Sequence, residues 1–196
     1  MEEKNEYWSD IFESLDFSCT ELNAKEFDGC AFKNCDFSEV IFKKCKFVDC
    51  EFTNCNLSLV KIPYTRFSDV SFYESKLVGI DWTKVDWPNL VLSAPIRFYK
   101  SVLNDCSFYG LSLQEMVLEE CKAHDVDFRE GDFSHANFTH TDLTGSLFAN
   151  TNLSDADLCE ASGYDIDIYH NEIKRAKFSR FEAIRLLDSL DIELVD

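Results

Sequence analysis

The chain has 196 residues, 45% of them hydrophobic, and a formal net charge of −18. This length is typical of a single domain, and without an apolar run of about 18 residues the sequence predicts no membrane-spanning helix. Phosphate groups are bound by Lys and Arg, so the negative charge argues against nucleic-acid or anionic-membrane binding and favours a basic partner. The acidic N-terminus lacks the apolar stretch of a signal peptide, and we expect a cytoplasmic protein.

Residues 1–14 come before the regular part of the sequence. Tyr7, Ile11 and Leu15 follow a helix-like spacing, and Asn5 is a suitable capping residue. Stacked repeats need a terminal cap, because their first unit would otherwise expose an apolar end and an open strand edge. We therefore expect a short helix or turn over residues 1–14 that acts as an N-terminal cap.

From residue 17 onward, every fifth residue is apolar, and we call these positions the central residues of five-residue units. The first series is Phe17, Leu22, Phe27, Phe32, Phe37, Phe42, Phe47, Phe52, Leu57, Ile62, Phe67, Phe72, Leu77, Trp82, Trp87 and Leu92. The second series is Leu103, Phe108, Leu113, Leu118, Ala123, Phe128, Phe133, Phe138, Leu143, Phe148, Leu153 and Leu158. A helix has a spacing near 3.6 and a half-buried strand a spacing of 2, so neither explains these series. A fixed short period is typical of a solenoid, whose units bury their apolar side chains by stacking.

Two residues before each central residue, the side chain is usually small or β-branched. Seven of the nine cysteines occupy this position: Cys30, Cys35, Cys45, Cys50, Cys55, Cys106 and Cys121. Their spacing differs from that of zinc fingers, so we interpret them as small inward-facing side chains rather than metal ligands. Stacking would bring some pairs within disulfide range, but in a reducing cytoplasm we expect free thiols.

The spacing shifts by one residue between the two series. Pro95 lies in this interval, and Phe98 already follows the second series. Proline cannot donate to a strand ladder, so we expect one inserted residue and a register slip near 93–97, with a bulge or a break in pairing. The slip divides the repeat region, residues 15–178, into two halves.

Residues 179–196 change to a helical pattern. Ser179 can cap the helix, with Glu182 as its capping-box partner, and the alternating tail after the helix predicts a short strand. The apolar stripe of this segment either caps the last coil alone or also pairs with a second copy, and we expect a homodimer. The predicted dimer interface is Ile184, Leu187, Leu190, Ile192 and Leu194.

The net negative charge is concentrated in residues 101–172, which we call the acidic half: it has 15 acids, and its only cations are Lys122 and Arg129. The predicted partner-binding face consists of ten acids at outward positions: Asp127, Asp132, Asp142, Asp157, Glu115, Glu120, Asp125, Glu130, Asp155 and Glu160. Stacking is expected to align acids in columns of like charge, whose repulsion suggests a use in binding. The alternative interpretation is that Asp and Asn residues hydrogen-bond the turns and that the acids maintain solubility.

The sequence contains no motif that selects a catalytic centre. It has six glycines and four histidines, and neither an HExxH nor a GxSxG pattern occurs. We therefore expect no enzyme activity, no cofactor and no metal site.

Units such as 136–140, 141–145 and 156–160 match A-(D/N)-(L/F)-x-x, and over residues 15–178 the chain resembles the pentapeptide-repeat family. The resemblance implies an all-β solenoid, a right-handed quadrilateral (pentapeptide-repeat) β-helix with four units in each coil. Residues about 20 apart would then stack about 4.8 Å from one another. The expected ladders include Phe27, Phe47, Phe67 and Trp87, and Phe32, Phe52, Phe72 and Leu92. The same rule places His135 between Glu115 and Asp155.

The C-terminal segment resembles the quinolone-resistance (Qnr-type) branch of that family, whose members protect or inhibit DNA gyrase. The resemblance implies a non-enzymatic DNA mimic: an acidic rod, dimeric through residues 179–196, that interacts with gyrase or another DNA-binding protein and confers quinolone resistance. The best-known members carry sizeable loops on the coil, whereas this sequence predicts only a one-residue slip. The alternative is a structural or protein-interaction scaffold with an unrelated partner.

Overall fold

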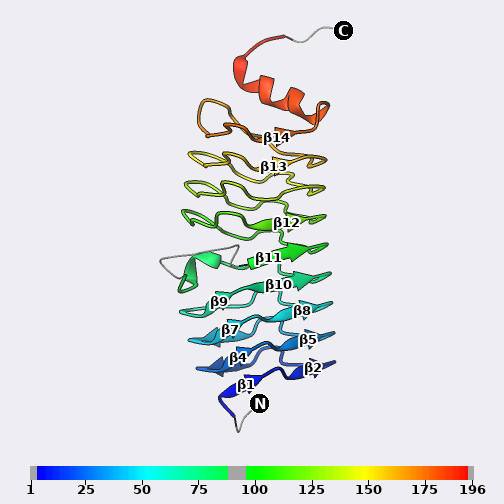
Figure 1. Ribbon diagram of the computed structural model, residues 1–196, viewed down its shortest axis with the longest axis vertical. Coiled ribbons are helices and arrows are strands. Elements are labelled where there is room, and N and C mark those ends of the chain that lie inside the picture. The colour runs from blue at the N-terminus through cyan, green and yellow to red at the C-terminus, as the bar shows by residue number, and fades with distance from the viewer. Residues whose placement is uncertain (1–3, 88–95, 194–196) are drawn as a thin grey trace.

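The computed structural model describes residues 4–87 and 96–193 and is a parallel β-solenoid of about eight turns (Figure 1). The coils stack along one axis, with the N-terminus at one end and a short helix at the other. This architecture confirms the predicted all-β quadrilateral β-helix with a C-terminal helix.

Each coil has four sides, which we name after the central residues of the first coil: the Tyr7, Phe12, Phe17 and Leu22 faces. The Tyr7 face contains β1 (Glu6–Trp8), β4 (Glu26–Asp28), β7 (Lys46–Val48) and β9 (Arg66–Ser68). The Phe12 face contains β2 (Ile11–Glu13), β5 (Ala31–Lys33), β8 (Glu51–Thr53), β10 (Val70–Tyr73), β11 (Ile96–Tyr99), β12 (Val117–Glu119), β13 (Asp157–Leu158) and β14 (Lys177–Phe178). The Leu22 face contains β3 (Glu21–Asn23) and β6 (Ile41–Lys43). Isolated parallel bridges continue this face and form the Phe17 face.

Neighbouring coils are offset by 20 residues, so equivalent side chains stack. Phe27 pairs with Phe47 and Phe47 with Phe67, with ring centroids 4.9 and 5.3 Å apart, which confirms this part of the predicted ladder. Rings on adjacent faces meet edge-on, as Phe27 and Phe32 do at 5.4 Å. Both arrangements are favourable for aromatic pairs and contribute about 0.5–1.5 kcal/mol beyond area burial.

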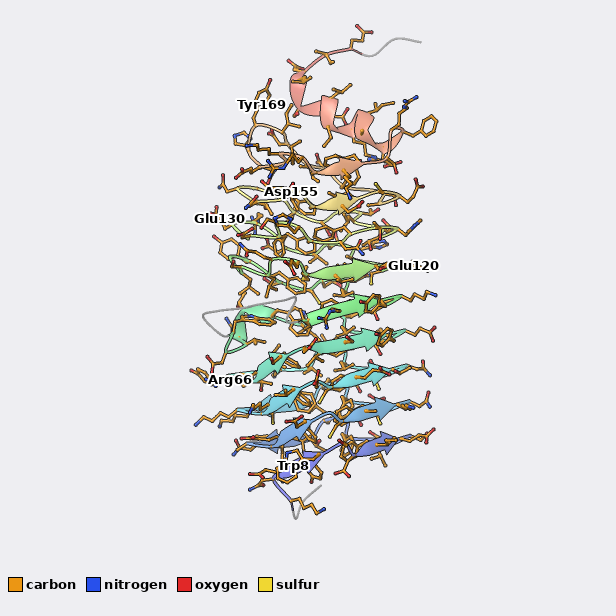
Figure 2. The ribbon with its side chains drawn as sticks, in the orientation of Figure 1. Trp8, Arg66, Glu120, Glu130, Asp155 and Tyr169 are labelled. Carbon is orange, nitrogen blue, oxygen red and sulfur yellow. The ribbon has the colours of Figure 1, made fainter. Side chains whose placement is uncertain are left out.

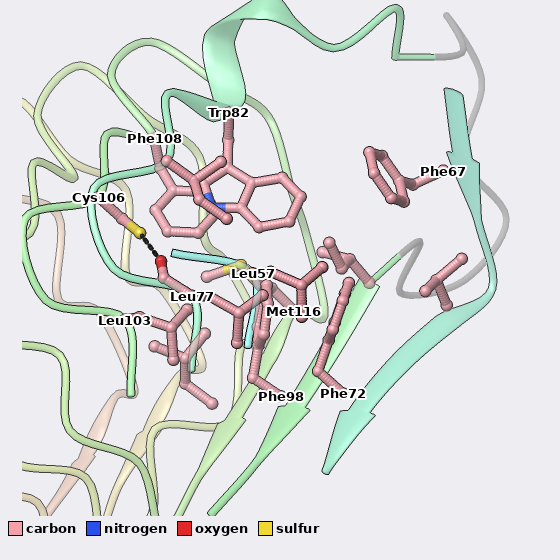
Figure 3. Packing of buried hydrophobic residues seen from close by; sticks show 14 of the residues in the cluster. Leu57, Phe67, Phe72, Leu77, Trp82, Phe98, Leu103, Cys106, Phe108 and Met116 are labelled. Carbon is pink, nitrogen blue, oxygen red and sulfur yellow. Dashed lines mark hydrogen bonds between the residues drawn. The ribbon is translucent and has the colours of Figure 1, made fainter. Parts of the chain in front are cut away.

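The small position before each central residue provides hydrogen bonds as well as packing. Thr141 Oγ1 donates to the carbonyl of Leu118 at 2.7 Å and accepts from the N–H of Cys121 at 3.2 Å, both in the coil below. Buried thiols donate to the equivalent carbonyl, as Cys106 Sγ does to Leu77 at 2.9 Å (Figure 3). Cys, Ser and Thr therefore act here as short polar ties between coils and not only as small fillers. The nine cysteines are free thiols in this structure.

The first coil begins earlier than predicted. Tyr7 and Phe12 lie in β1 and β2, where we expected a helix or turn, and their rings stack on Phe27 and Phe32 at 5.1 and 4.9 Å. Both fall on the five-residue spacing counted back from the first series. Stacking on the next coil thus outweighs the helix-like spacing of residues 1–14, and the expected helix or turn is wrong for their described part.

The coil in the middle of the chain is six residues longer than the others, not one residue longer. In the pairing of β10 with β11, Val70 lies beside Ile96 and Phe72 beside Phe98, an offset of 26 residues. In the pairing of β10 with β8, the offset is the usual 20 residues. Six residues equal one complete five-residue unit plus one residue. The spacing of apolar residues in the sequence therefore shows only the shift of one residue and hides the extra unit. The predicted pairing of Phe72 with Leu92 is therefore wrong, and residues 88–95 lie outside the described part.

The start of this long coil also departs from the repeat. A short 3-10 helix, η1 (Trp82–Lys84), replaces the usual turn on the Leu22 face. The Trp82 ring is buried, stacks on Phe108 at 5.7 Å and meets Phe72 and Phe98 edge-on (Figure 3). A larger ring at the site of the insertion thus keeps the core continuous.

The C-terminal helix, η2 (Glu182–Leu190), is a 3-10 helix that packs Leu186 against the core. Ser179 does not cap it: the Ser179 hydroxyl donates to Glu160 Oε1 at 2.9 Å and accepts from the Glu160 N–H at 2.7 Å. Residues 191–193 form no strand, and 194–196 lie outside the described part. The expected terminal strand is therefore not formed by the described residues.

Candidate protein-binding surface

The predicted acidic residues surround the rod and do not form one face. Glu115, Glu120, Asp125 and Glu130 are successive corners of one coil. Figure 2 shows Glu120 and Glu130 on opposite sides of the rod. The bridges of Asp127, Asp132, Asp142 and Asp157 likewise belong to four different faces. Each five-residue unit forms one side of the square coil. Acids that are five residues apart in the sequence therefore lie on successive faces and cannot share one.

Several of the predicted acids alternate with other side chains along their face, although Asp125 stacks above Asp105. His135 lies between Glu115 and Asp155, as predicted, with its Nε2 3.9 Å from Asp155 Oδ2. Asp142 stacks on Lys122 in the coil below. The prediction of columns of like charge is therefore wrong for Glu115, Asp155 and Asp142, because the sequence places a basic or titratable side chain next to them in the stack.

Four of the predicted acids, each directly before a central residue, brace the turns. The carboxylates of Asp127, Asp132, Asp142 and Asp157 accept hydrogen bonds from the N–H groups two positions on, at 3.1, 3.0, 3.1 and 3.0 Å. This is the turn function that the alternative interpretation assigns to Asp residues. A carboxylate with this function has one oxygen committed to the backbone of its own coil.

Two of these aspartates also pair with cations. Arg129 donates to both oxygens of Asp127, at 2.9 and 2.8 Å, and Lys177 Nζ donates to Asp157 at 2.9 Å. The hydrogen bond from Arg129 is the largest cause that lowers the pKa of Asp127 from its ordinary value. Burial alone would raise the pKa of Asp157, but the hydrogen bonds from Cys159 and Lys177 outweigh it and lower the pKa. These acids therefore stay ionised, with part of their charge compensated.

Asp142 has a histidine partner. His124 Nε2 lies 2.7 Å from Asp142 Oδ2. Burial raises the pKa of the Asp142 carboxyl, but hydrogen bonds from Thr144 and His124 outweigh it and lower the pKa. The carboxylate is thus held in its charged form by its surroundings.

The corner acids are more available to a partner. Glu115, Glu120, Asp125 and Glu130 have left-handed backbone φ angles of 61, 54, 55 and 59°. Lys100 Nζ lies 3.7 Å from Glu120, and Asn150 donates to Glu130 at 2.8 Å. Among the described residues, no backbone N–H donates to these four carboxylates, so they can contact a partner without the loss of a turn.

Helix η2 leaves an apolar strip uncovered. Ile184 is 50% exposed and Ile192 is 53% exposed, while Leu187 and Leu190 are half-buried. Leu194, the fifth predicted interface residue, lies outside the described part. Phe181 directly precedes the helix and is 86% exposed, although the predicted interface omits it.

Sequence reasoning missed a group of exposed apolar residues in the acidic half: Tyr109, Leu147 and Tyr169. All three flank central residues on the Leu22 face. Leu147 left a signal in the sequence, because it takes the place before a central residue where the repeat has Asp or Asn. The two tyrosines occupy positions at which the repeat accepts any residue, so nothing in the sequence marks them.

Two further properties concern residues 4–87 and 96–193. Over these ranges, no helix is long and apolar enough to cross a membrane. The same ranges contain no cluster of three His, Cys, Asp or Glu side chains placed to hold a metal ion.

Comparison with known proteins identifies the family. The family model of the pentapeptide repeat region matches residues 25–94 and 80–158, more than half of the chain. The chain belongs to the pentapeptide-repeat family. No curated protein matches the pentapeptide-repeat chain in a sequence search.

Solved pentapeptide-repeat structures share the fold of the whole chain. A trypsin-treated variant of QnrB1, a plasmid-mediated fluoroquinolone resistance protein, aligns with a TM-score of 0.65 and 21% identity, covering 97% of this chain and 92% of that one. Full-length QnrB1 aligns with a TM-score of 0.64 and 16% identity, covering 93% and 100%. At these identities the likeness shows a common fold.

Proposed function

We propose that this pentapeptide-repeat protein is a non-enzymatic DNA mimic that occupies the DNA site of DNA gyrase or another type II topoisomerase and thereby confers quinolone resistance. The likeness to a fluoroquinolone resistance protein supports the choice of partner through the shared fold. The observation that carries the proposal is the charge of the acidic half.

The linear charge density of the acidic half is close to that of duplex DNA. Residues 101–172 contain 15 acids and two cations, a net charge of −13. With coils of 20 residues stacked about 4.8 Å apart, this stretch is about 17 Å long and has one net negative charge for about every 1.3 Å. Duplex DNA carries one charge for about every 1.7 Å. The acids of the rod also lie on all four faces, as phosphates surround a duplex.

The middle of the rod lacks this charge, whereas residues 1–32, with nine acids and two cations, have a net charge of −7. Residues 33–100 contain ten cations and eight acids, a net charge of +2 over a similar length. A general need for solubility would not leave a long middle stretch without net negative charge. We therefore assign the DNA-like surface to the acidic half.

The apolar strip of η2 supports a dimer as part of the same proposal. Phe181, Ile184 and Ile192 are exposed at the end of the rod that is next to the acidic half. A second copy joined there would place two acidic halves in line and lengthen the DNA-like surface.

The test measures gyrase activity. Purified gyrase supercoils relaxed plasmid in the presence of increasing amounts of the protein, with and without a quinolone. We expect wild-type protein to reduce supercoiling or to reverse the quinolone effect, more strongly at low salt, because screening weakens charge–charge attraction. A protein that changes neither readout at saturating amounts would refute the proposal.

A matched pair of variants separates charge from turn structure. The test variant replaces Asp127, Asp132, Asp142 and Asp157 by Asn, which keeps an acceptor oxygen for each turn but removes the charge. The control replaces Asp16, Asp36 and Asp81 by Asn; these accept the equivalent hydrogen bond from the N–H two positions on, at 2.9, 2.8 and 3.1 Å, outside the acidic half, with Asp81 as the cap of η1. We expect the effect on gyrase to be lost in the first variant only. Equal losses in both would favour the scaffold interpretation.

A further inference from the structure

The exposed apolar side chains of the acidic half lie on one face of the rod. Between residues 96 and 178, the large exposed hydrophobic side chains are Tyr109, Leu147 and Tyr169, at 49, 47 and 70% exposure. All three belong to the Leu22 face, and Figure 2 shows Tyr169 on the same side of the rod as Glu130. The other three faces of these coils carry polar and half-buried side chains at the same positions.

The needs of the fold do not account for these residues. Leu147 stacks directly above Asp127, which braces its own turn through a hydrogen bond from Arg129 N–H. Leucine cannot accept that bond, so at this position the chain gives up a turn contact and leaves an apolar side chain in solvent. Tyr109 lies below Arg129, whose guanidinium carbon is 5.8 Å from the ring centroid. Tyrosine and arginine are enriched in the cores of protein interfaces.

The acids alone cannot orient the rod. Because they lie on all four faces, a basic surface would attract the rod at any rotation about its axis. Apolar anchors on a single face remove this degeneracy, since they contribute affinity only when that face is buried. Electrostatic attraction would then set the rate of encounter, and the anchors would set the orientation and the lifetime of the complex.

We propose that the Leu22 face between Tyr109 and Tyr169 is the contact surface for the protein partner, a DNA-binding enzyme with an apolar recess beside its basic track. The inference rests on the proposed function, because Asp127, Glu130 and Asp167 outnumber the cation Arg129 on this face and so favour a basic partner. The anchors span three coil spacings, about 14 Å, which fits a contact along the rod and not at its end.

The first measurement compares two glutamates on different faces, Glu130 beside Asn150 and Glu120 beside Lys100. Glu130 and Glu120 occupy equivalent corners, with φ angles of 59 and 54°, on the Leu22 and Phe12 faces. Each is replaced by Gln, and the dissociation constant for immobilised DNA gyrase is measured. We expect Glu130→Gln to weaken binding about threefold or more and Glu120→Gln to change it less than about twofold. Equal losses would overturn the inference, because they would mean that binding does not depend on rotation.

The second measurement sets binding against stability. Leu147→Asn restores the residue type that braces a turn, so we expect an unchanged or higher melting temperature together with a weakened affinity for gyrase. The double variant Tyr109→Ala/Tyr169→Ala should weaken binding about tenfold or more, since truncation of anchor residues typically has effects of this size. Wild-type affinity in Leu147→Asn and in the double variant would overturn the contact face but leave the proposed function intact. Absence of wild-type binding would overturn both.

Discussion

The hydroxyl of Thr141 provides the sharpest test of how one coil is tied to the next. Thr141 is fully buried, and its Oγ1 binds two backbone groups of the coil below, the Leu118 carbonyl at 2.7 Å and the Cys121 N–H at 3.2 Å. Thr141→Val keeps the shape of the side chain but removes both hydrogen bonds. Loss of a partner for a buried polar group costs about 1–3 kcal/mol, so we expect a loss of about 2–3 kcal/mol in the free energy of unfolding.

Thr141→Ser is the matched control. It keeps the hydroxyl and loses one methyl group, for which we expect a cost of about 1 kcal/mol. Equilibrium urea denaturation measures both variants, and amide hydrogen exchange at Cys121 should be faster in Thr141→Val than in Thr141→Ser. If Thr141→Val were as stable as Thr141→Ser, the small position would serve packing alone and the reasoning would be wrong.

Three further predictions concern pH, thiol reactivity and assembly. Hydrogen bonds outweigh burial and lower the pKa of Asp142 from 3.8, so its stabilising effect is complete above that value and is lost as the pH falls through the lower folded pKa. Asp142→Asn should therefore flatten the dependence of melting temperature on pH between about pH 4 and pH 2, and an unchanged slope would contradict this. Burial raises the pKa of Cys106 and Cys121 to about 12, so iodoacetamide at pH 8 should label exposed Cys19 first, and rapid multiple labelling of native protein would contradict the stacked core. Light scattering should give twice the 22.7 kDa chain mass, falling to one chain in Ile184→Asp; a wild-type monomer at micromolar concentration would exclude the dimer.

The five-residue spacing was sufficient to predict the fold because solenoid stacking is nearly local. Each unit turns the chain by one side of the square, and its partner always lies a fixed number of units away. The stacking of Phe27 on Phe47 and the position of His135 next to Asp155 therefore follow from counting along the sequence. The same counting predicts the core, since an inward position in one coil is inward in all of them.

The features that sequence reasoning missed are those that a period cannot encode. A six-residue insertion and a one-residue slip shift the spacing equally, so only the pairing of Phe72 with Phe98 reveals the long coil. The first coil is an exception, because Tyr7 and Phe12 do fit the five-residue spacing. A helix-like spacing fits the same segment, and only the stacking on Phe27 and Phe32 decides between the two.

The sequence by itself determined the square coil, its inward side chains and the acidic bias of the second half. The tertiary structure decided how the acids are used: Asp142 braces a turn and contacts His124, whereas Glu130 stays at an open corner. It also decided that Tyr109 and Leu147, which the count places on one face, stay exposed there. The physical reason is that charge and periodicity are properties of the chain, whereas hydrogen-bond partners and exposure depend on the side chains that surround each residue in the folded stack.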